Sequence, residues 1–137
     1  MEVKASLQNL RLSPRKTRLV VRLLQGLSVE EAEAQLSFLA KRCSVPLLKL
    51  LRSATANAEH NFSLAKGNLF IKSMTANEGV ALKRWMPRAQ GRATPIKKRA
   101  CHVALVLSDS LPGDKQETKI VTKTPKTEAV KPTVDKK

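Results

Sequence analysis

The sequence predicts an α+β fold, in which three helices pack on a small β-sheet and a long basic β-hairpin protrudes. Three segments have helical periodicity with recognisable start signals, and short apolar runs typical of strands flank them. The third observation is the stretch from Gly79 to Val103, which has no acidic residue and whose prolines exclude a helix. Its seven positive side chains are Lys83, Arg84, Arg88, Arg92, Lys97, Lys98 and Arg99.

The first helix begins at Ser13-Pro14, a capping residue followed by a first-turn proline, and Gly26 ends it. Its apolar stripe predicts the side chains that face the core: Leu19, Val20, Leu23 and Leu24. Basic residues occupy most of the remaining surface: Arg15, Lys16, Arg18 and Arg22.

Two more helices follow directly. Ser28 and Glu31 form the pattern of a capping box that opens the second helix. Its predicted apolar face is Val29, Ala32, Leu36, Leu39 and Ala40. The third helix starts at Ser44 and Pro46 and fades near His60. Its predicted inward residues are Leu47, Leu48, Leu51, Ala54 and Ala58.

Strand patterns lie before and after the helices. Val3, Ala5 and Leu7 alternate with polar residues near the N-terminus. Leu69 to Ile71 opens another strand, and Val103 to Leu107 reads as a buried one. Three helices on these strands make a domain of about 100 residues, enough for a modest core.

The basic stretch is expected to form a hairpin over about residues 75–107. Pro87, Gly91 and Pro95 are turn or edge residues, which places the tip near Arg88 to Ala93. An arm of about 13 residues reaches about 40 Å, whereas a domain of this size has a radius of gyration of about 13 Å. An isolated two-stranded ribbon is only marginally stable, so we expect its binding partner to order it.

The positive charge belongs to the predicted globular domain, residues 1–108, rather than to the extension, residues 109–137. The domain has 19 basic and 6 acidic residues, net +13, whereas the extension has 7 and 5, net +2. The extension has no aromatic residue and no periodicity, and is expected to be disordered. A basic folded surface favours nucleic acid as partner, with an anionic membrane surface as the alternative.

Membrane insertion, catalysis and metal binding have little support. The longest apolar run, Val103 to Leu107, is far shorter than a spanning helix, and the N-terminus lacks the layout of a signal peptide. We therefore expect a cytoplasmic protein. No catalytic constellation, cofactor motif or metal-ligand spacing is present, so neither an enzyme nor a cofactor is expected. Cys43 and Cys101 are expected to be reduced and partly buried.

Contacts with nucleic-acid phosphates are expected along the hairpin and at the start of the first helix, where arginine forks and backbone donors suit phosphates. Trp85 has two interpretations, stacking on a splayed base or packing against the other arm of the hairpin. The candidate RNA-binding residues are Arg11, Arg15, Lys16, Arg18, Arg22, Lys83, Arg84, Trp85, Arg88, Arg92, Lys97, Lys98 and Arg99.

Three motifs in order resemble the bacterial-type large-subunit ribosomal protein L-twenty-two family. They are Leu12-Ser13-Pro14-Arg15-Lys16-Thr17-Arg18-Leu19-Val20, then Leu50 to Asn61 (LLRSATANAEHN), then Leu82 to Ala93 (LKRWMPRAQGRA) with Lys98, Arg99 and His102 beyond. The resemblance covers roughly residues 3–108.

The resemblance implies a structural constituent of a bacterial or organellar large ribosomal subunit that binds large-subunit ribosomal RNA and aids assembly. It implies a globular domain near the exit of the polypeptide tunnel and a hairpin that lines the tunnel. The tip would face the nascent polypeptide near the constriction, opposite a loop of protein L-four. The tip residues are Arg88, Ala89, Gln90, Gly91, Arg92 and Ala93.

The alternative is a free nucleic-acid-binding module, such as a helix-turn-helix regulator built on the first two helices. That alternative leaves the basic hairpin without a role.

Overall fold

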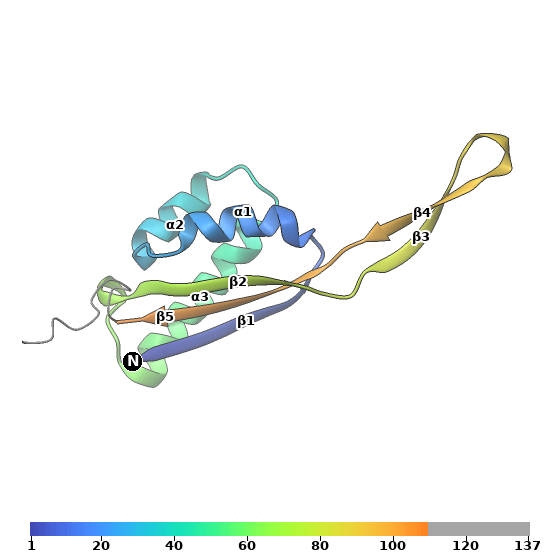
Figure 1. Cartoon of the computed structure of the whole chain (residues 1–137). Helices are drawn as coiled ribbons and strands as arrows, with labels where there is room; N and C mark the ends of the chain where they lie inside the picture. Colours follow the sequence, from blue (N-terminus) through green and yellow to red (C-terminus); the bar gives the residue numbers. More distant parts are fainter. Residues whose placement is uncertain (110–137) are drawn as a thin grey trace, which may run out of the picture.

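The computed structural model describes residues 1–109 and confirms the predicted α+β class (Figure 1). The predicted disordered extension, residues 109–137, lies outside the described residues except for Asp109. In chain order the elements are β1 (Glu2–Leu10), α1 (Pro14–Leu24), α2 (Val29–Phe38), α3 (Ser44–Phe62), the single turn η1 (Lys66–Asn68), β2 (Phe70–Glu78), β3 (Leu82–Pro87), the single turn η2 (Ala89–Gly91), β4 (Ala93–Lys98) and β5 (Cys101–Ser108).

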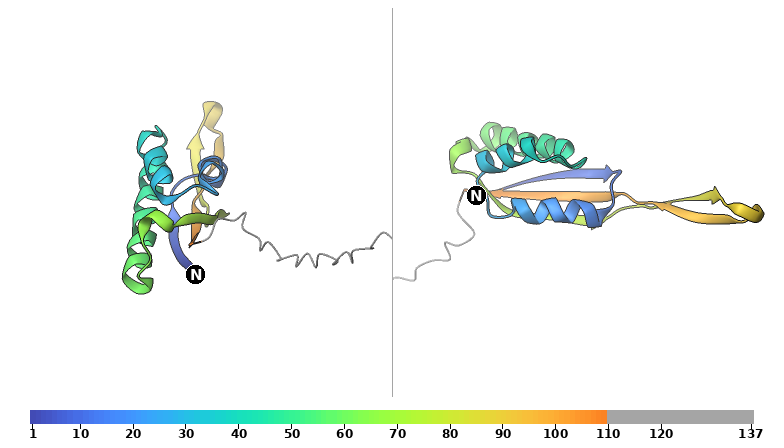
Figure 2. Two further views of the ribbon diagram at one scale, coloured as in Figure 1. Left: turned by 90° about the vertical axis from the view of Figure 1, so that its left-hand side faces the viewer. Right: turned by 90° about the horizontal axis from the view of Figure 1, so that it is seen from above.

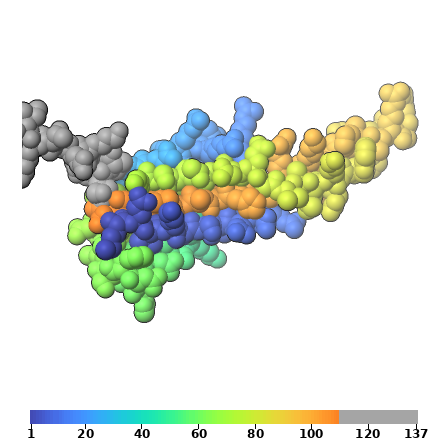
Figure 3. Space-filling model, turned by 60° about the horizontal axis from the view of Figure 1, so that its bottom comes forward, coloured from blue at the N-terminus to red at the C-terminus, as the bar shows by residue number. Residues whose placement is uncertain are grey.

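The globule is a three-stranded antiparallel sheet with its helices on one face. The strand order is β1-β5-β2, so β5 is central and pairs with both neighbours. Figure 2 shows the helices gathered on one side of the sheet, and Figure 3 shows the three strands uncovered on the other. The core lies between the two layers, where Leu47, Leu51, Ile71 and Leu105 are buried.

The hairpin consists of two ladders rather than the single uninterrupted ribbon expected over 75–107. The inner ladder, β2 with β5, belongs to the sheet and ends at Glu78 opposite Cys101. The outer ladder, β3 with β4, begins at Leu82 opposite Lys98 and forms a sheet of its own. We call residues 79–81 and 99–100 between them the neck. Only the part beyond the neck leaves the globule (Figure 1).

Helix α1 presents a different face to the core than the one predicted. Val20 and Leu24 are buried as expected, but Leu19 is 69% exposed and Leu23 is 50% exposed. Thr17 and Val21 are buried in their place. The apolar residues of this helix form two overlapping stripes that share Val20 and Leu24, and packing against β2 selects the one containing Val21.

The helix starts differ in how they are capped. The predicted capping box is confirmed, because Ser28 Oγ accepts from the Glu31 amide and Glu31 Oε2 accepts from the Ser28 amide, both at 3.3 Å. Ser13 precedes Pro14 as predicted, but its hydroxyl forms no capping bond. Helix α2 ends at Phe38, so the predicted inward residue Ala40 lies beyond it and is exposed.

Both cysteines are free and buried, as the sequence suggested. Burial raises the pKa of the Cys43 thiol, and Cys101 Sγ lies 3.5 Å from the hydroxyl of Thr17. Across residues 1–109, none of the helices combines the length and apolar composition needed to cross a lipid bilayer.

Candidate nucleic-acid interface

The outer ladder places like charges opposite one another. Nearly every residue of β3 and β4 is exposed, and Lys83 is paired directly with Lys97. Like charges facing each other across an antiparallel pair are destabilising. Such a pairing is favourable when an anionic group lies between the two ammonium groups, so the ladder is suited to a polyanion.

The two faces of the outer ladder carry different chemistry. Because opposite residues share a face and neighbours alternate, Lys83, Trp85 and Lys97 lie on one face, and Arg84 and Lys98 on the other. Trp85 is opposite Pro95 and is 71% exposed. The indole is therefore not buried against the other arm, which favours the stacking interpretation.

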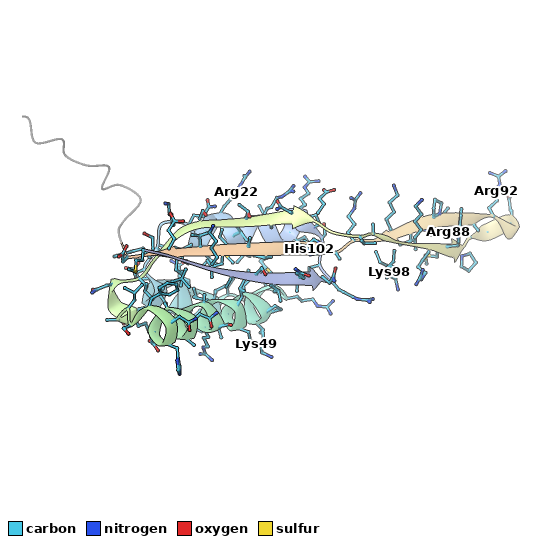
Figure 4. All side chains as sticks on the ribbon, turned by 90° about the horizontal axis from the view of Figure 1, so that it is seen from below. Arg22, Lys49, Arg88, Arg92, Lys98 and His102 are labelled. Atoms are coloured by element: carbon cyan, nitrogen blue, oxygen red, sulfur yellow. The ribbon has the colours of Figure 1, made fainter. Side chains whose placement is uncertain are left out.

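The tip is a tight turn held by backbone bonds. The amide of Arg88 donates to the carbonyl of Arg92 at 2.8 Å, which closes the turn. Gln90 and Gly91 have φ of 59° and 66°, the left-handed region that is unfavourable for Gln90 and natural for Gly91. All six predicted tip residues are exposed, and Figure 4 shows Arg88 and Arg92 at the far end of the molecule.

A basic cleft of about 390 Å³ lies where the hairpin leaves the globule. It brings together the two basic patches that the sequence keeps apart, the start of α1 and the base of the hairpin. Four cations line it, together with the helix-start residue Ser13: Arg11, Lys16, Lys98 and Arg99. Phosphates that follow the hairpin toward the globule would reach this cleft next.

Arg18 and Arg22 stand apart from the cleft. Arg18 Nε donates to the carbonyl of Ala76 at 3.0 Å, so this side chain also ties α1 to β2. Arg22 is exposed and projects from the helical side of the globule, away from the hairpin (Figure 4). The structure thus collects most of the predicted RNA-binding residues on the hairpin and its cleft, whereas the exposed side chains of Arg15, Arg18 and Arg22 on α1 do not line that cleft.

The ion pairs among the described residues all lie within the globule. Glu33 forms ion pairs with Lys66 at 2.7 Å and with Arg52 at 3.6 Å. The hydrogen bond with Glu33 raises the pKa of Lys66. Glu2 is bound by Lys72, whose hydrogen bond lowers the pKa of the Glu2 carboxyl. Within residues 1–109, no ion pair reaches β3 or β4.

Three residues to which the sequence analysis assigned no structural role, Asn9, Gly79 and His102, shape the neck. Asn9 has φ of 55° at a bulge in β1, and its amide donates to His102 Nδ1 at 3.2 Å. The His102 ring also lies against Gly79, where a Cβ atom would come 2.9 Å from Nε2. A glycine inside a strand pattern is a signal of such close approach, but nothing in the sequence indicates the bulge.

Comparison with known proteins agrees with this architecture. The family described as "Ribosomal protein L22p/L17e" matches residues 5–108. The chain is 50% identical over 106 residues to "Large ribosomal subunit protein uL22" of Lactobacillus helveticus, covering 77% of this chain and 91% of the relative. It is 48% identical over 109 residues to the uL22 of Staphylococcus aureus, covering 80% and 93%. It is 46% identical over 107 residues to "Large ribosomal subunit protein uL22c" of Marchantia polymorpha, covering 78% and 90%.

The match begins within β1 and ends with β5, so it contains all three helices, the neck and the hairpin. The chain therefore belongs to the ribosomal protein L22p/L17e family, whose members are structural rather than catalytic proteins.

Proposed function

We propose that this protein is a structural constituent of the large ribosomal subunit and binds large-subunit ribosomal RNA through the hairpin and the cleft at its neck. The observation that carries the proposal is the opposed pair Lys83 and Lys97 on an exposed ladder that no ion pair reaches within residues 1–109. Double-helical and folded RNA can surround such a ladder with phosphates and 2′-hydroxyls. Proteins recognise these groups mainly through the shape of the RNA.

The tip residues Arg88 to Ala93 are proposed to line the polypeptide exit tunnel near its constriction. Their exposure, together with a turn fixed by its own backbone bond, supports a tip that presents Arg88 and Arg92 beyond the RNA. The partners are then large-subunit ribosomal RNA, other large-subunit proteins including protein L-four, and the nascent polypeptide. A chain that joins a globule to a distant hairpin also suits a role in assembly, because it can bind separate parts of the RNA at once.

The helix-turn-helix alternative finds little support in the geometry. In that reading α2 would enter the major groove. Its sequence contains no basic residue, and Glu30 and Glu31 are exposed in its first turn. Carboxylates there would repel the phosphates of DNA.

Salt-dependent binding to a protein-free bacterial large-subunit RNA transcript tests the proposed interface. We expect Lys83→Ala with Lys97→Ala to weaken binding and to reduce the slope of log K against log salt by about 1.5, since each phosphate contact contributes about 0.7 to 0.9. Lys49→Ala with Lys72→Ala removes the same charge from the globule instead of the outer ladder and serves as the control. Equal slopes of log K against log salt for the two double variants would show that the hairpin does not bind the RNA.

A further inference from the structure

An apolar groove lies on the helical side of the globule, between α1 and the end of α2. One hollow is lined by Leu23, Ala34, Gln35, Phe38 and Leu39. A second is lined by Leu12, Lys16, Leu19, Val20 and residues 40–43. Because Leu19 and Leu23 are one helical turn apart and residues 39 and 40 are consecutive, the hollows adjoin. We call the two together the Phe38 groove.

Phe38 is the most exposed large apolar side chain among the described residues, at 89%. It is the last residue of α2, and the next amide, that of Leu39, still donates to the Gln35 carbonyl at 3.0 Å. The helical turn beneath the ring is therefore ordered while the ring itself contacts solvent. Together with Leu19 and Leu23, it forms an apolar surface without cover in the described part of the chain.

The rim of this groove is positively charged. Lys16, Lys41 and Arg42 line the second hollow, and Arg22 precedes Leu23 on an exposed part of α1. No acidic side chain lines either hollow. An occupant that suits this lining brings both apolar surface and negative charge.

We propose that an unpaired nucleotide of the large-subunit RNA occupies the Phe38 groove, with its base stacked on the Phe38 ring and its flanking phosphates at Lys41 and Arg42. This inference rests on the proposed function, which supplies the RNA. Each nucleotide carries a flat apolar base and one phosphate, which matches an aromatic ring beside cations. The exposed amide of Gln35 offers a donor and an acceptor to the edge of such a base.

The groove is a further RNA attachment point, and it adjoins the basic cleft at the neck because Lys16 lines both. Figure 1 shows α2 on the opposite side of the globule from β3 and β4. The bound RNA would therefore contact the hairpin with its phosphates and the end of α2 with a stacked base. Leu19 and Leu23, which are exposed rather than packed in the core, would form the floor of this site.

The test measures the affinity of the full chain for the protein-free large-subunit transcript. Phe38→Ala and Phe38→Leu should each weaken binding about tenfold, the loss expected for one base–aromatic stack. Phe38→Tyr should bind like the unaltered protein because it keeps the ring. None of these variants should change the salt slope, whereas Lys41→Ala with Arg42→Ala should reduce it by about 1.5. Val45→Ala, which also removes an exposed apolar side chain, is the control.

Each outcome decides between occupants. Full affinity in Phe38→Leu would overturn stacking, because the leucine keeps apolar surface without a ring. Full affinity of Phe38→Ala for bare RNA, with a loss only when other large-subunit proteins are present, would assign the groove to a protein and overturn the inference. Failure of the unaltered chain to bind the transcript would instead refute the proposed function. Thermal unfolding of each variant checks that the fold is intact.

Discussion

Gly79 is the residue on which the join between globule and hairpin depends. Its amide donates to the Ala100 carbonyl at 2.9 Å, and the His102 ring occupies the space where a side chain would begin. His102 in turn accepts from the amide of Asn9. A side chain at position 79 requires this ring to shift, which strains its hydrogen bond to the β1 bulge.

We therefore expect Gly79→Ala to lower the free energy of unfolding by about 1 to 2 kcal/mol, the range for a lost hydrogen bond and a strained contact. Gly67→Ala is the matched control, because a Cβ there meets nothing within 4 Å; it should be neutral or slightly stabilising. Chemical denaturation of both variants makes the measurement. A Gly79→Ala protein as stable as the Gly67→Ala protein would contradict the role of the His102 contact.

Among the elements, β5 and the outer ladder differ most in burial. Val103, Leu105 and Leu107 of β5 are buried between two strands and the helices. The residues of β3 and β4 have one partner strand each and contribute no residue to the buried core. Backbone bonds without packing beneath them open easily.

Hydrogen exchange should detect this difference directly. In the free protein we expect amides of β3 and β4 to exchange orders of magnitude faster than those of Val103 to Leu107. Addition of the large-subunit transcript should slow exchange in the outer ladder and leave β5 nearly unchanged. Equal protection of both ladders in the free protein would show that RNA is not needed to order the hairpin.

The sequence predicted the elements well because their signals are local. The capping box at Ser28, the proline at the start of α1 and the run ending in Leu107 each depend on neighbouring residues alone. Half of the predicted inward face of α1 was wrong: Val20 and Leu24 are buried, but Leu19 and Leu23 are exposed. Two apolar stripes of similar strength overlap on this helix, and only contact with β2 decides between them. The basic cleft could not be predicted, since Arg11 and Lys98 meet only through the fold.

At the scale of the whole molecule, the protein is a globule from which the outer ladder projects. The globule has one core, and its ion pairs, such as those of Glu33, are internal to it. Beyond the neck there is no buried core among the described residues, and the surface is dominated by positive charge. The two parts should therefore respond independently to changes in sequence.

Deleting facing pairs of residues from the outer ladder tests this independence and the position of the tip. Deleting Arg84 and Trp85 with their partners Pro95 and Ile96 removes two residues from each strand, so every remaining side chain keeps its face. In a cryo-electron microscopy map of the large subunit, the tip should withdraw by about 7 Å. The unfolding midpoint of the globule should stay the same.

Replacing the same four residues by alanine is the control, because it removes the side chains and keeps the length. The alanine variant should leave the tip in place. A tip that does not move in the shortened protein would refute the proposed tunnel position.

The neck has three residues on one strand and two on the other, with a backbone bond from Gly79 to Ala100. Beyond it, the outer ladder of six residues per strand extends about 20 Å. A lever of that length turns a rotation of about 10° at the neck into a displacement of about 3.5 Å at the tip. The direction in which the tip points is thus set by a few atoms around Gly79, Ala100 and His102, far from anything the tip touches.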